Sequence, residues 1–253
     1  MSQSTIRNSN SRIALRPDVF ADAPRVVAGF STRHGGVSEA PYDSLNLSRH
    51  VGDDPDAVAE NRRRFCAALG TDPNRLATAR QVHADTVHTV RNPGEVADCD
   101  ALVTDTPNLL LAITAADCAV VLLADPAARV VGACHAGWRG AVAAIVPKTI
   151  EQMQSLGAHS SRMRAYISPC IHRAAFEVGP EVADQFDAAV VHRRDEWAKP
   201  HVDLPDALRR QLADAGVPHV ETADRCTVQN DAFFSYRRDG DPMGCMFGAI
   251  GLA

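Results

Sequence analysis

"LLLAITAADCAVVLLADPAARVVGACHAGWRG" (residues 109–140) holds two apolar runs separated by Asp-Pro-Ala-Ala at residues 125–128. Apolar runs on either side of such turn residues are typical of paired strands in a sheet. The stretch therefore predicts a β-hairpin whose second strand ends on His135. Gly137 and Gly140 come directly after it and would let the backbone bend tightly and approach a ligand closely.

The turn sets the register of this hairpin. If the turn is symmetric, Ala124 pairs with Arg129 and Cys118 lies opposite His135. Directly opposed side chains have Cβ atoms about 4.5–5.5 Å apart, so this thiolate and this imidazole would bind one metal ion or form a Cys–His catalytic pair. Cys134 would point to the opposite face. A turn one residue longer or shorter would misalign the pair.

A zinc site in an enzyme commonly uses three protein ligands and a water, so a third side chain is needed. We choose His83 in "QVHAD" (residues 81–85), on a strand predicted over residues 78–90. The helix after His135 carries Arg139 in its first turn and would direct its N-terminus toward the same space. Helix N-termini attract anions, so a phosphate beside the pair is physically reasonable.

Simpler interpretations exist for each of these residues. A histidine in a strand is more often a satisfied polar residue than a ligand, and Cys118 in an apolar run is often a small buried side chain. An arginine in the first turn of a helix, such as Arg139, is often simply solvated. The predicted opposition of Cys118 and His135 is what raises this pair above that background.

The remaining patterns predict strands and helices in mixed order. Strands are expected at residues 25–32, 164–167, 219–224 ("HVETAD"), 232–238 ("AFFSYRR") and 246–253 ("MFGAIGLA"); helices are expected at 54–70, 138–156 with a break at Pro147, 181–188 and 204–215. Because strands and helices do not alternate as βαβ units, we expect an α/β fold with mixed β-sheets flanked by helices. We expect one layered domain over residues 16–253, preceded by a loose segment over residues 1–15.

Composition excludes several kinds of partner. The net charge is −5 and no basic run of five residues occurs, which argues against nucleic acid. The sequence has no apolar stretch of about 18 residues for a membrane span and no apolar signal-peptide core. Seven scattered cysteines, an odd number, suit a reducing compartment. We expect a cytoplasmic monomer or small homo-oligomer.

Several motifs together resemble one known family. In chain order they are "STRHGGVS", "YDSLNLSRHVGDDPDAVAENR", "QVHAD", "AADC", "ACHAGWRG", "SPCI…FEVGPEV" and "CT…FFSYRRDG". They resemble the YfiH/FAMIN family, also labelled multicopper polyphenol oxidoreductase or laccase-domain proteins, over residues 29–252. The resemblance implies a fold like that of cytotoxic-necrotizing-factor-type cysteine hydrolases. It also implies a zinc ion held by His83, Cys118 and His135, which would be the catalytic residues.

The resemblance implies a purine nucleoside phosphorylase that also deaminates adenosine. Its substrates would be phosphate and adenosine, inosine, guanosine or methylthioadenosine, and its products the free base and ribose 1-phosphate. We expect Arg33 and Arg139 to contact phosphate or ribose, and Asn46 to make a polar substrate contact.

Three other functions remain open. In a metal-free Cys–His hydrolase, an amidase that edits peptidoglycan precursors, Cys118 would be the nucleophile and His135 its base. Copper-dependent polyphenol oxidation needs several histidine-rich copper sites, and the sequence has no His-x-His motif. The third is a binding or scaffold protein with a relict pocket.

Three positions depart from the family pattern. Ala119 stands where the family often has a proline shortly after the Ala-Asp-Cys motif. Ser168 replaces the glycine of the family's Gly-Pro-Cys-Ile, and Cys245 stands where the family usually has an arginine. The last change bears most directly on anion or substrate binding, and none touches the three expected ligands.

Overall fold

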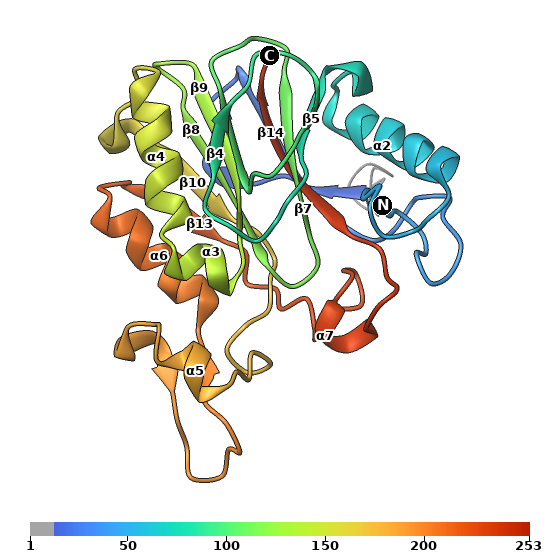
Figure 1. The fold of residues 1–253 in the computed structure, drawn as a ribbon. Helices are drawn as coiled ribbons and strands as arrows, with labels where there is room; N and C mark the ends of the chain where they lie inside the picture. Colours follow the sequence, from blue (N-terminus) through green and yellow to red (C-terminus); the bar gives the residue numbers. More distant parts are fainter. Residues whose placement is uncertain (1–12) are drawn as a thin grey trace, which may run out of the picture.

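Two six-stranded β-sheets lie face to face in the computed structural model, which describes residues 13–253 (Figure 1). The first sheet has the order β1 (Ala14–Leu15), β2 (Val26–Ser31), β14 (Met246–Leu252), β7 (Leu110–Ala115), β3 (Leu76–Ala79) and β5 (Gly94–Val96). The second has the order β13 (His219–Thr222), β10 (Arg164–Ile167), β8 (Ala119–Asp125), β9 (Val130–Ala136), β6 (Ala101–Thr104) and β4 (Val87–Thr89). Both sheets contain parallel and antiparallel pairs, so both are mixed as expected.

Helices cover the outer face of each sheet and make four layers. On one side lie α3 (Trp138–Val142), α4 (Ile145–Ser155) and α6 (Leu204–Asp214), and on the other lies α2 (Pro55–Leu69) (Figure 1). Apolar side chains fill the space between the sheets, among them Phe30, Ile113 and Leu122. The structure thus confirms the layered α/β fold with mixed sheets flanked by helices. No helix within residues 13–253 combines the length and the apolar character that crossing a membrane requires.

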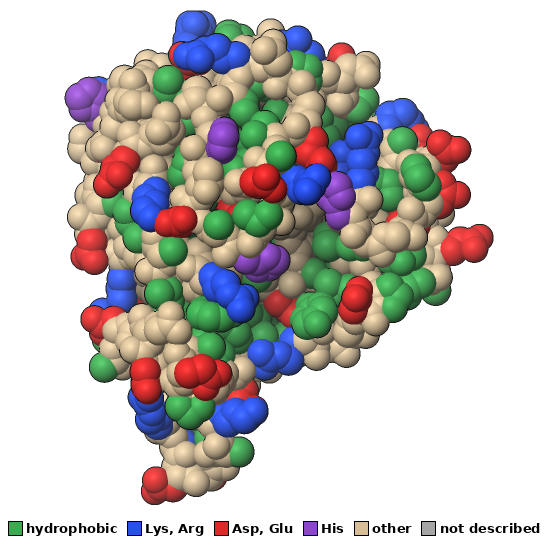
Figure 2. Space-filling view, in the orientation of Figure 1, with side chains coloured by type: hydrophobic (Ala, Val, Ile, Leu, Met, Phe, Trp, Pro, Cys, Tyr) green, Lys and Arg blue, Asp and Glu red, His purple; other side chains and the backbone are tan. Residues whose placement is uncertain are grey.

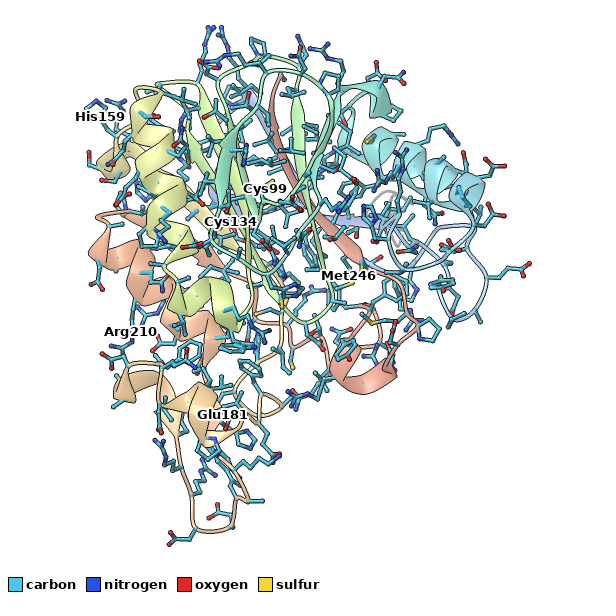
Figure 3. The ribbon with its side chains drawn as sticks, in the orientation of Figure 1. Cys99, Cys134, His159, Glu181, Arg210 and Met246 are labelled. Carbon is cyan, nitrogen blue, oxygen red and sulfur yellow. The ribbon has the colours of Figure 1, made fainter. Side chains whose placement is uncertain are left out.

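The prediction for Cys134 is confirmed. Cys134 packs in the core beneath α4, whereas Cys99, from the loop before β6, belongs to the core between the sheets; Figure 3 labels both. Alternation along β9 therefore separates Cys134 from its neighbour His135.

Helix α2 spans the range that the sequence predicts, and of the two possible N-caps, Asp54 and Asp56, the structure shows the first. Asp54 is the N-cap, and its carboxylate accepts hydrogen bonds from the backbone N–H groups of Asp56 and Ala57. Gly70 ends the helix at a φ of 76°, where a side chain would be strained. The buried face of α2 includes Phe65 and, one turn earlier, Arg62.

The hairpin exists, but its predicted register is wrong by two residues. His135 pairs with Val120 instead of Cys118, and Asp125 pairs with Val130. Asp125 Oδ1 accepts hydrogen bonds from the N–H groups of Ala127 and Ala128, which moves the turn one residue further along the chain. A shift of two residues preserves the face of each side chain, so Cys118, directly before β8, still approaches His135.

Two predicted elements contain an unforeseen break. Residues 78–90 contain the end of β3 and the whole of β4, with a loop between them that contains His83. The helical segment 138–156 divides at Ala144, where φ is 61°, and not at Pro147. Pro147 lies in the first turn of α4, where a backbone N–H has no intrahelical partner to lose.

Three further predictions need correction. Residues 232–238 are not a strand: Phe233 and Phe234 enter the core as coil, and Ser235 caps the short helix α7 (Tyr236–Asp239). The helix at residues 181–188 shrinks to α5 (Pro180–Ala183), with a 3₁₀ turn after it at Ala188–Val190. The segment expected to be loose, residues 1–15, lies mostly outside the described residues, but its last two residues form β1 and pair with β2.

Residues 172–203 form a projection below the sheets (Figure 1). It carries α5, on which Figure 3 labels Glu181, and a small sheet of β11 (Val191–His192) and β12 (His201–Val202). Phe176, at the base of the projection, lines a cavity.

Candidate metal centre and substrate cavity

His83, Cys118 and His135 converge at the same end of the two sheets. One potential ligand atom from each lies within 4.8 Å of the other two. The rings of His83 and His135 meet edge to face, with centroids 4.8 Å apart. Within residues 13–253 this is the one group of three or more His, Cys, Asp or Glu side chains close enough to share a metal ion.

A buried carboxylate shapes the loop that carries His83. Asp100 is fully buried directly before β6, and its two oxygens accept hydrogen bonds from the consecutive backbone N–H groups of Val82, His83 and Ala84 at 2.8–3.1 Å. These bonds hold His83 at a φ of 58°, a left-handed conformation that a non-glycine residue seldom adopts. The loop therefore wraps around Asp100 and presents the histidine.

The same carboxylate orients His135. Asp100 Oδ1 lies 2.9 Å from Nδ1 of His135, whose backbone N–H also donates to the carbonyl oxygen of Asp100. Burial alone would raise the pKa of Asp100, but hydrogen bonds from His135 and the N–H of Ala84 outweigh burial and lower it. The carboxylate thus keeps a proton on Nδ1 and leaves Nε2 available as a ligand. Sequence reasoning missed Asp100, whose only signal is an acid before an apolar strand.

Asp117, the residue directly before Cys118, has a positive φ, which a non-glycine residue seldom adopts. Asp117 has a φ of 84°, and its carboxylate accepts hydrogen bonds from the Thr227 hydroxyl and the Arg237 N–H, both at 2.6 Å. A Cβ atom added to Gly137 would lie 2.7 Å from the Cys118 sulfur, so only glycine leaves room for the thiol here. This close approach explains why a glycine comes directly after the strand that carries His135.

The thiol and the imidazole polarise each other. Burial would raise the pKa of Cys118, but the charge and hydrogen bonds of His135 and His83 lower it to about 6. Burial would likewise lower the pKa of His135, but the Cys118 thiolate and Asp100 raise it to about 9. Without a metal, the pair is therefore a thiolate beside an imidazolium at neutral pH.

A cavity of about 450 Å³ opens beside His83 and Cys118. Its wall is mostly apolar and includes Trp138, Phe176 and Leu204, with Arg237 from α7 at its edge. Figure 2 shows a hollow on this face with hydrophobic side chains around it and a histidine beside it. A concave, largely apolar cavity with a few polar groups is the usual form of a small-molecule site.

The three expected substrate contacts do not line this cavity. Asn46 is fully buried, and its side chain bonds to Ser48, Asp53 and the N–H of Cys245. Arg33 stacks on Phe234 and hydrogen-bonds to Asp43. Arg139 is exposed and stacks on the ring of Trp138, which places it near the cavity rim.

Asn46 lies behind the cavity wall, whereas Arg237 lies on it. Asn46 positions the backbone of Cys245, a cavity residue, from behind the wall. Arg237, expected on a strand over residues 232–238, lies on the wall because α7 replaces that strand. Its guanidinium donates to the carbonyl oxygens of Ala175 and Glu177, which ties α7 to the base of the projection.

The donor set fits zinc. Two imidazole nitrogens and one thiolate sulfur are common zinc ligands, and three protein ligands leave a fourth position for a small molecule. The hydrogen bond from His135 to a buried carboxylate is the usual support of a metal-binding histidine. The exposed edge of His83 on the cavity connects this ligand set to the space available for a substrate.

Comparisons with known proteins identify the family of the chain. The family model described as "Multi-copper polyphenol oxidoreductase laccase" matches residues 27–253. The chain is 47% identical to "Purine nucleoside phosphorylase" of Deinococcus radiodurans over 88% of each chain. It is 40% identical to "Purine nucleoside phosphorylase YfiH" of Escherichia coli over 85% of this chain and 89% of that protein.

Two solved structures have the same fold. The Bacillus licheniformis protein YfiH superposes with a TM-score of 0.89 at 31% identity, covering 96% of this chain and 97% of that one. YlmD from Geobacillus stearothermophilus superposes with a TM-score of 0.88 at 34% identity, with the same coverage. The chain therefore belongs to the multi-copper polyphenol oxidoreductase laccase family, the family of the YfiH proteins.

Proposed function

We propose that the protein is a zinc-dependent purine nucleoside phosphorylase. It would convert phosphate and adenosine, inosine, guanosine or methylthioadenosine into the free base and the sugar 1-phosphate, and it would also deaminate adenosine. The observation that carries the proposal is the convergence of His83, Cys118 and His135 beside the 450 Å³ cavity, whose wall includes His83 and Cys118. Relatives named purine nucleoside phosphorylase, at 40–47% identity, support the choice of reaction.

The cavity suits a nucleoside. Trp138, Phe176 and Leu204 offer apolar surface to the faces of a purine, and His83 and Cys118 lie on the wall of the same cavity. In phosphorolysis a phosphate oxygen forms a bond to C1′ of the ribose, and the bond from C1′ to N9 of the base breaks. The electron pair of that bond leaves with the base, which then takes up a proton.

The chain's own residues would orient the substrate and stabilise charge. Arg237, anchored through its backbone N–H to Asp117, places a positive charge at the cavity wall, where it would stabilise negative charge on the departing base. Asp100 holds His83 and His135 in fixed positions, so no reorganisation is needed during the reaction. A zinc ion held by His83, Cys118 and His135 would supply a Lewis acid.

The direct test is incubation of the purified protein with adenosine, with and without phosphate, and detection of the products by mass spectrometry. The proposal expects adenine and ribose 1-phosphate only when phosphate is present, and inosine from deamination in either case. Cys118→Ala should abolish all three products. Turnover that persists in this variant would refute the assignment of the site.

The lowered pKa of Cys118 favours a second candidate, a metal-free Cys–His hydrolase acting on peptidoglycan precursors. Here the Cys118 thiolate would attack the carbonyl carbon of an amide, and His135, the base that holds the thiol proton, would give it to the amine that leaves as the C–N bond breaks. Water would then release the acyl group from the sulfur. Activity on amide substrates that survives chelation, with no release of adenine from adenosine, would favour this hydrolase.

The remaining parts of the proposal concern copper, the domain and the location. One His–Cys–His group within residues 13–253 supports a single-metal site more than polyphenol oxidation, which uses several copper sites. We take residues 16–253 as one catalytic domain. All seven cysteines are free thiols, which supports a cytoplasmic location.

A further inference from the structure

A second cavity, of about 330 Å³, adjoins the first across His83. Both cavities include His83 and Thr114 in their walls. The second cavity, which we call the arginine pocket, is lined by Ser48, Arg49, His50, Arg62, Thr78, Ala79, Arg80, Gln81, His83, Glu95 and Thr114. Nothing in the proposed function so far uses its three arginines.

Arg62 is the unusual member of the arginine pocket. Arg62 is only 7% exposed, yet it forms no ion pair within residues 13–253. Its Nε donates to the carbonyl oxygen of Leu47, and its guanidinium stacks on Phe247, while its two terminal nitrogens have no hydrogen-bond partner among the described residues. Glu95 on the same wall attracts this charge but forms no direct ion pair with it. A buried guanidinium whose terminal nitrogens are not engaged is typical of a site that receives an anion.

Burial, then repulsion from Arg49, lowers the pKa of Arg62 to about 10. Arg62 is still protonated at neutral pH. Its positive charge is thus present in the pocket before any ligand arrives.

Arg49 and Arg80 increase the positive charge. Neither forms a side-chain hydrogen bond or ion pair in the part of the chain that the structure describes, and both are exposed at the pocket. Glu95 is the one carboxylate on the pocket wall, and it pairs with His50 at 2.7 Å. The wall of the pocket therefore carries three guanidinium groups and a single carboxylate, and that carboxylate is bonded to His50. Figure 2 shows basic side chains beside a histidine on the same face as the hollow.

The fold brings these arginines together from three segments. Arg62 lies on the buried face of α2, Arg80 comes directly after β3, and Arg49 lies in the loop after the buried residues Asn46–Ser48. Guanidinium groups present forked N–H donors that match the oxygens of phosphate. Ser48 and Thr78 add hydroxyl groups to the same wall.

We propose that the arginine pocket binds inorganic phosphate and delivers it across His83 to the substrate in the first cavity. This inference rests on the proposed function for the role of phosphate as co-substrate, but the binding itself does not depend on that role. The phosphate oxygen would reach C1′ from the side of the arginine pocket. The base would lie in the apolar cavity on the other side of His83.

Free phosphate and the phosphoryl group of a nucleotide share this chemistry, so the test must separate them. Isothermal titration would measure the binding of inorganic phosphate and of adenosine 5′-monophosphate to the full-length protein. We expect phosphate to bind, and we expect Arg49→Ala and Arg80→Ala each to weaken it by about tenfold or more. Arg91→Ala removes an exposed arginine outside both cavities and should leave phosphate binding unchanged.

Arg62→Met is the strongest variant, because it keeps most of the apolar stem of the side chain and removes the buried charge. If Arg62→Met fails to fold, the two exposed variants still decide the matter. In steady-state kinetics, Arg49→Ala and Arg80→Ala should raise the KM for phosphate by about tenfold and leave the KM for adenosine unchanged. A general structural defect would raise the KM for phosphate and the KM for adenosine together.

Three results would overturn the inference. They are phosphate binding that all three arginine variants retain, binding of the nucleotide but not of phosphate, and no binding of either anion. If the arginine variants lose phosphate binding but the wild-type protein releases no base from any nucleoside, the pocket stands and the proposed phosphorolysis fails.

Discussion

Asp100 Oδ1 lies 2.9 Å from Nδ1 of His135, and the same oxygen accepts a hydrogen bond from the backbone N–H of His83. One buried carboxylate therefore positions two of the three expected metal ligands, although one lies on a loop and the other at the end of β9. The position of Cys118 depends on different partners, Asp117 and Gly137.

Asp100→Asn should weaken zinc binding by about 10- to 100-fold, because an amide accepts fewer hydrogen bonds and no longer fixes the proton on His135. Competition with a chromogenic zinc chelator would measure the change. Asp98→Asn alters an exposed acid two residues away and is the matched control. Equal zinc affinity in Asp100→Asn and the control would show that the carboxylate does not position the ligands.

Gly137→Ala should disturb the site through contact alone. The added methyl group would lie 2.7 Å from the Cys118 sulfur, well inside a van der Waals contact, so the thiol must move. We expect at least a tenfold loss of zinc affinity with a folded protein by circular dichroism. Gly157→Ala, at a φ of 93° in open space, should lower stability by about 1 kcal/mol and leave zinc affinity unaltered. Wild-type affinity in Gly137→Ala would contradict this contact.

Cys118 should be the most reactive thiol of metal-free protein. Its pKa of about 6 predicts alkylation by iodoacetamide that rises through pH 6 and is nearly complete at pH 7, whereas Cys134, with a pKa of about 12, should stay unmodified. Peptide mass spectrometry across pH 5–9 would monitor both residues, and bound zinc should protect Cys118. Alkylation of Cys118 that begins only above pH 8 would be inconsistent with the thiolate pair.

Asp125 should support stability in a pH-dependent way. Its side chain is fully buried, and burial would raise its pKa, but Arg162 and the N–H groups of His159 and Ala128 lower it below its ordinary value of 3.8. Because the folded-state pKa is lowered, its stabilisation is fully present well above pH 3.8 and is lost as the pH falls through the folded value.

Asp125→Asn should therefore lower the free energy of unfolding by about 2–4 kcal/mol at pH 7, and this difference should shrink at acidic pH. Urea unfolding at pH 7 and pH 3 would measure it, with the exposed Asp105→Asn as control. A difference that stays constant between the two pH values would count against a charged Asp125 in the folded state.

Features that depend on local patterns could be predicted from the sequence. The caps of α2, the apolar hairpin strands and the placement of Cys118 and His135 on one face all depend on short-range spacing. Even the register error was harmless, because a shift of two residues preserves the face of a strand. Spacing alone left His83 as one choice among ten histidines, and the family resemblance then implied it as the third ligand.

The predictions that failed concern contacts between distant segments. The loop at His83 exists because Asp100, 17 residues away, accepts its N–H groups. The segment at residues 232–238 resembles a strand because Phe233 and Phe234 are apolar, but Ser235 begins a helix whose Arg237 reaches the cavity. In the sequence Arg62 cannot be told from the neighbouring arginines of α2, and only the packing of α2 on the first sheet reveals it as buried and without an ion pair among residues 13–253.

The most direct test of the three-ligand centre is the zinc content of protein purified without added metal, measured by mass spectrometry for the wild type and for His83→Ala, Cys118→Ala and His135→Ala. The account predicts about one zinc per wild-type chain and a loss of zinc in each variant, while His88→Ala, an exposed histidine on β4, keeps its metal. Full zinc occupancy in folded Cys118→Ala and His135→Ala proteins would contradict it.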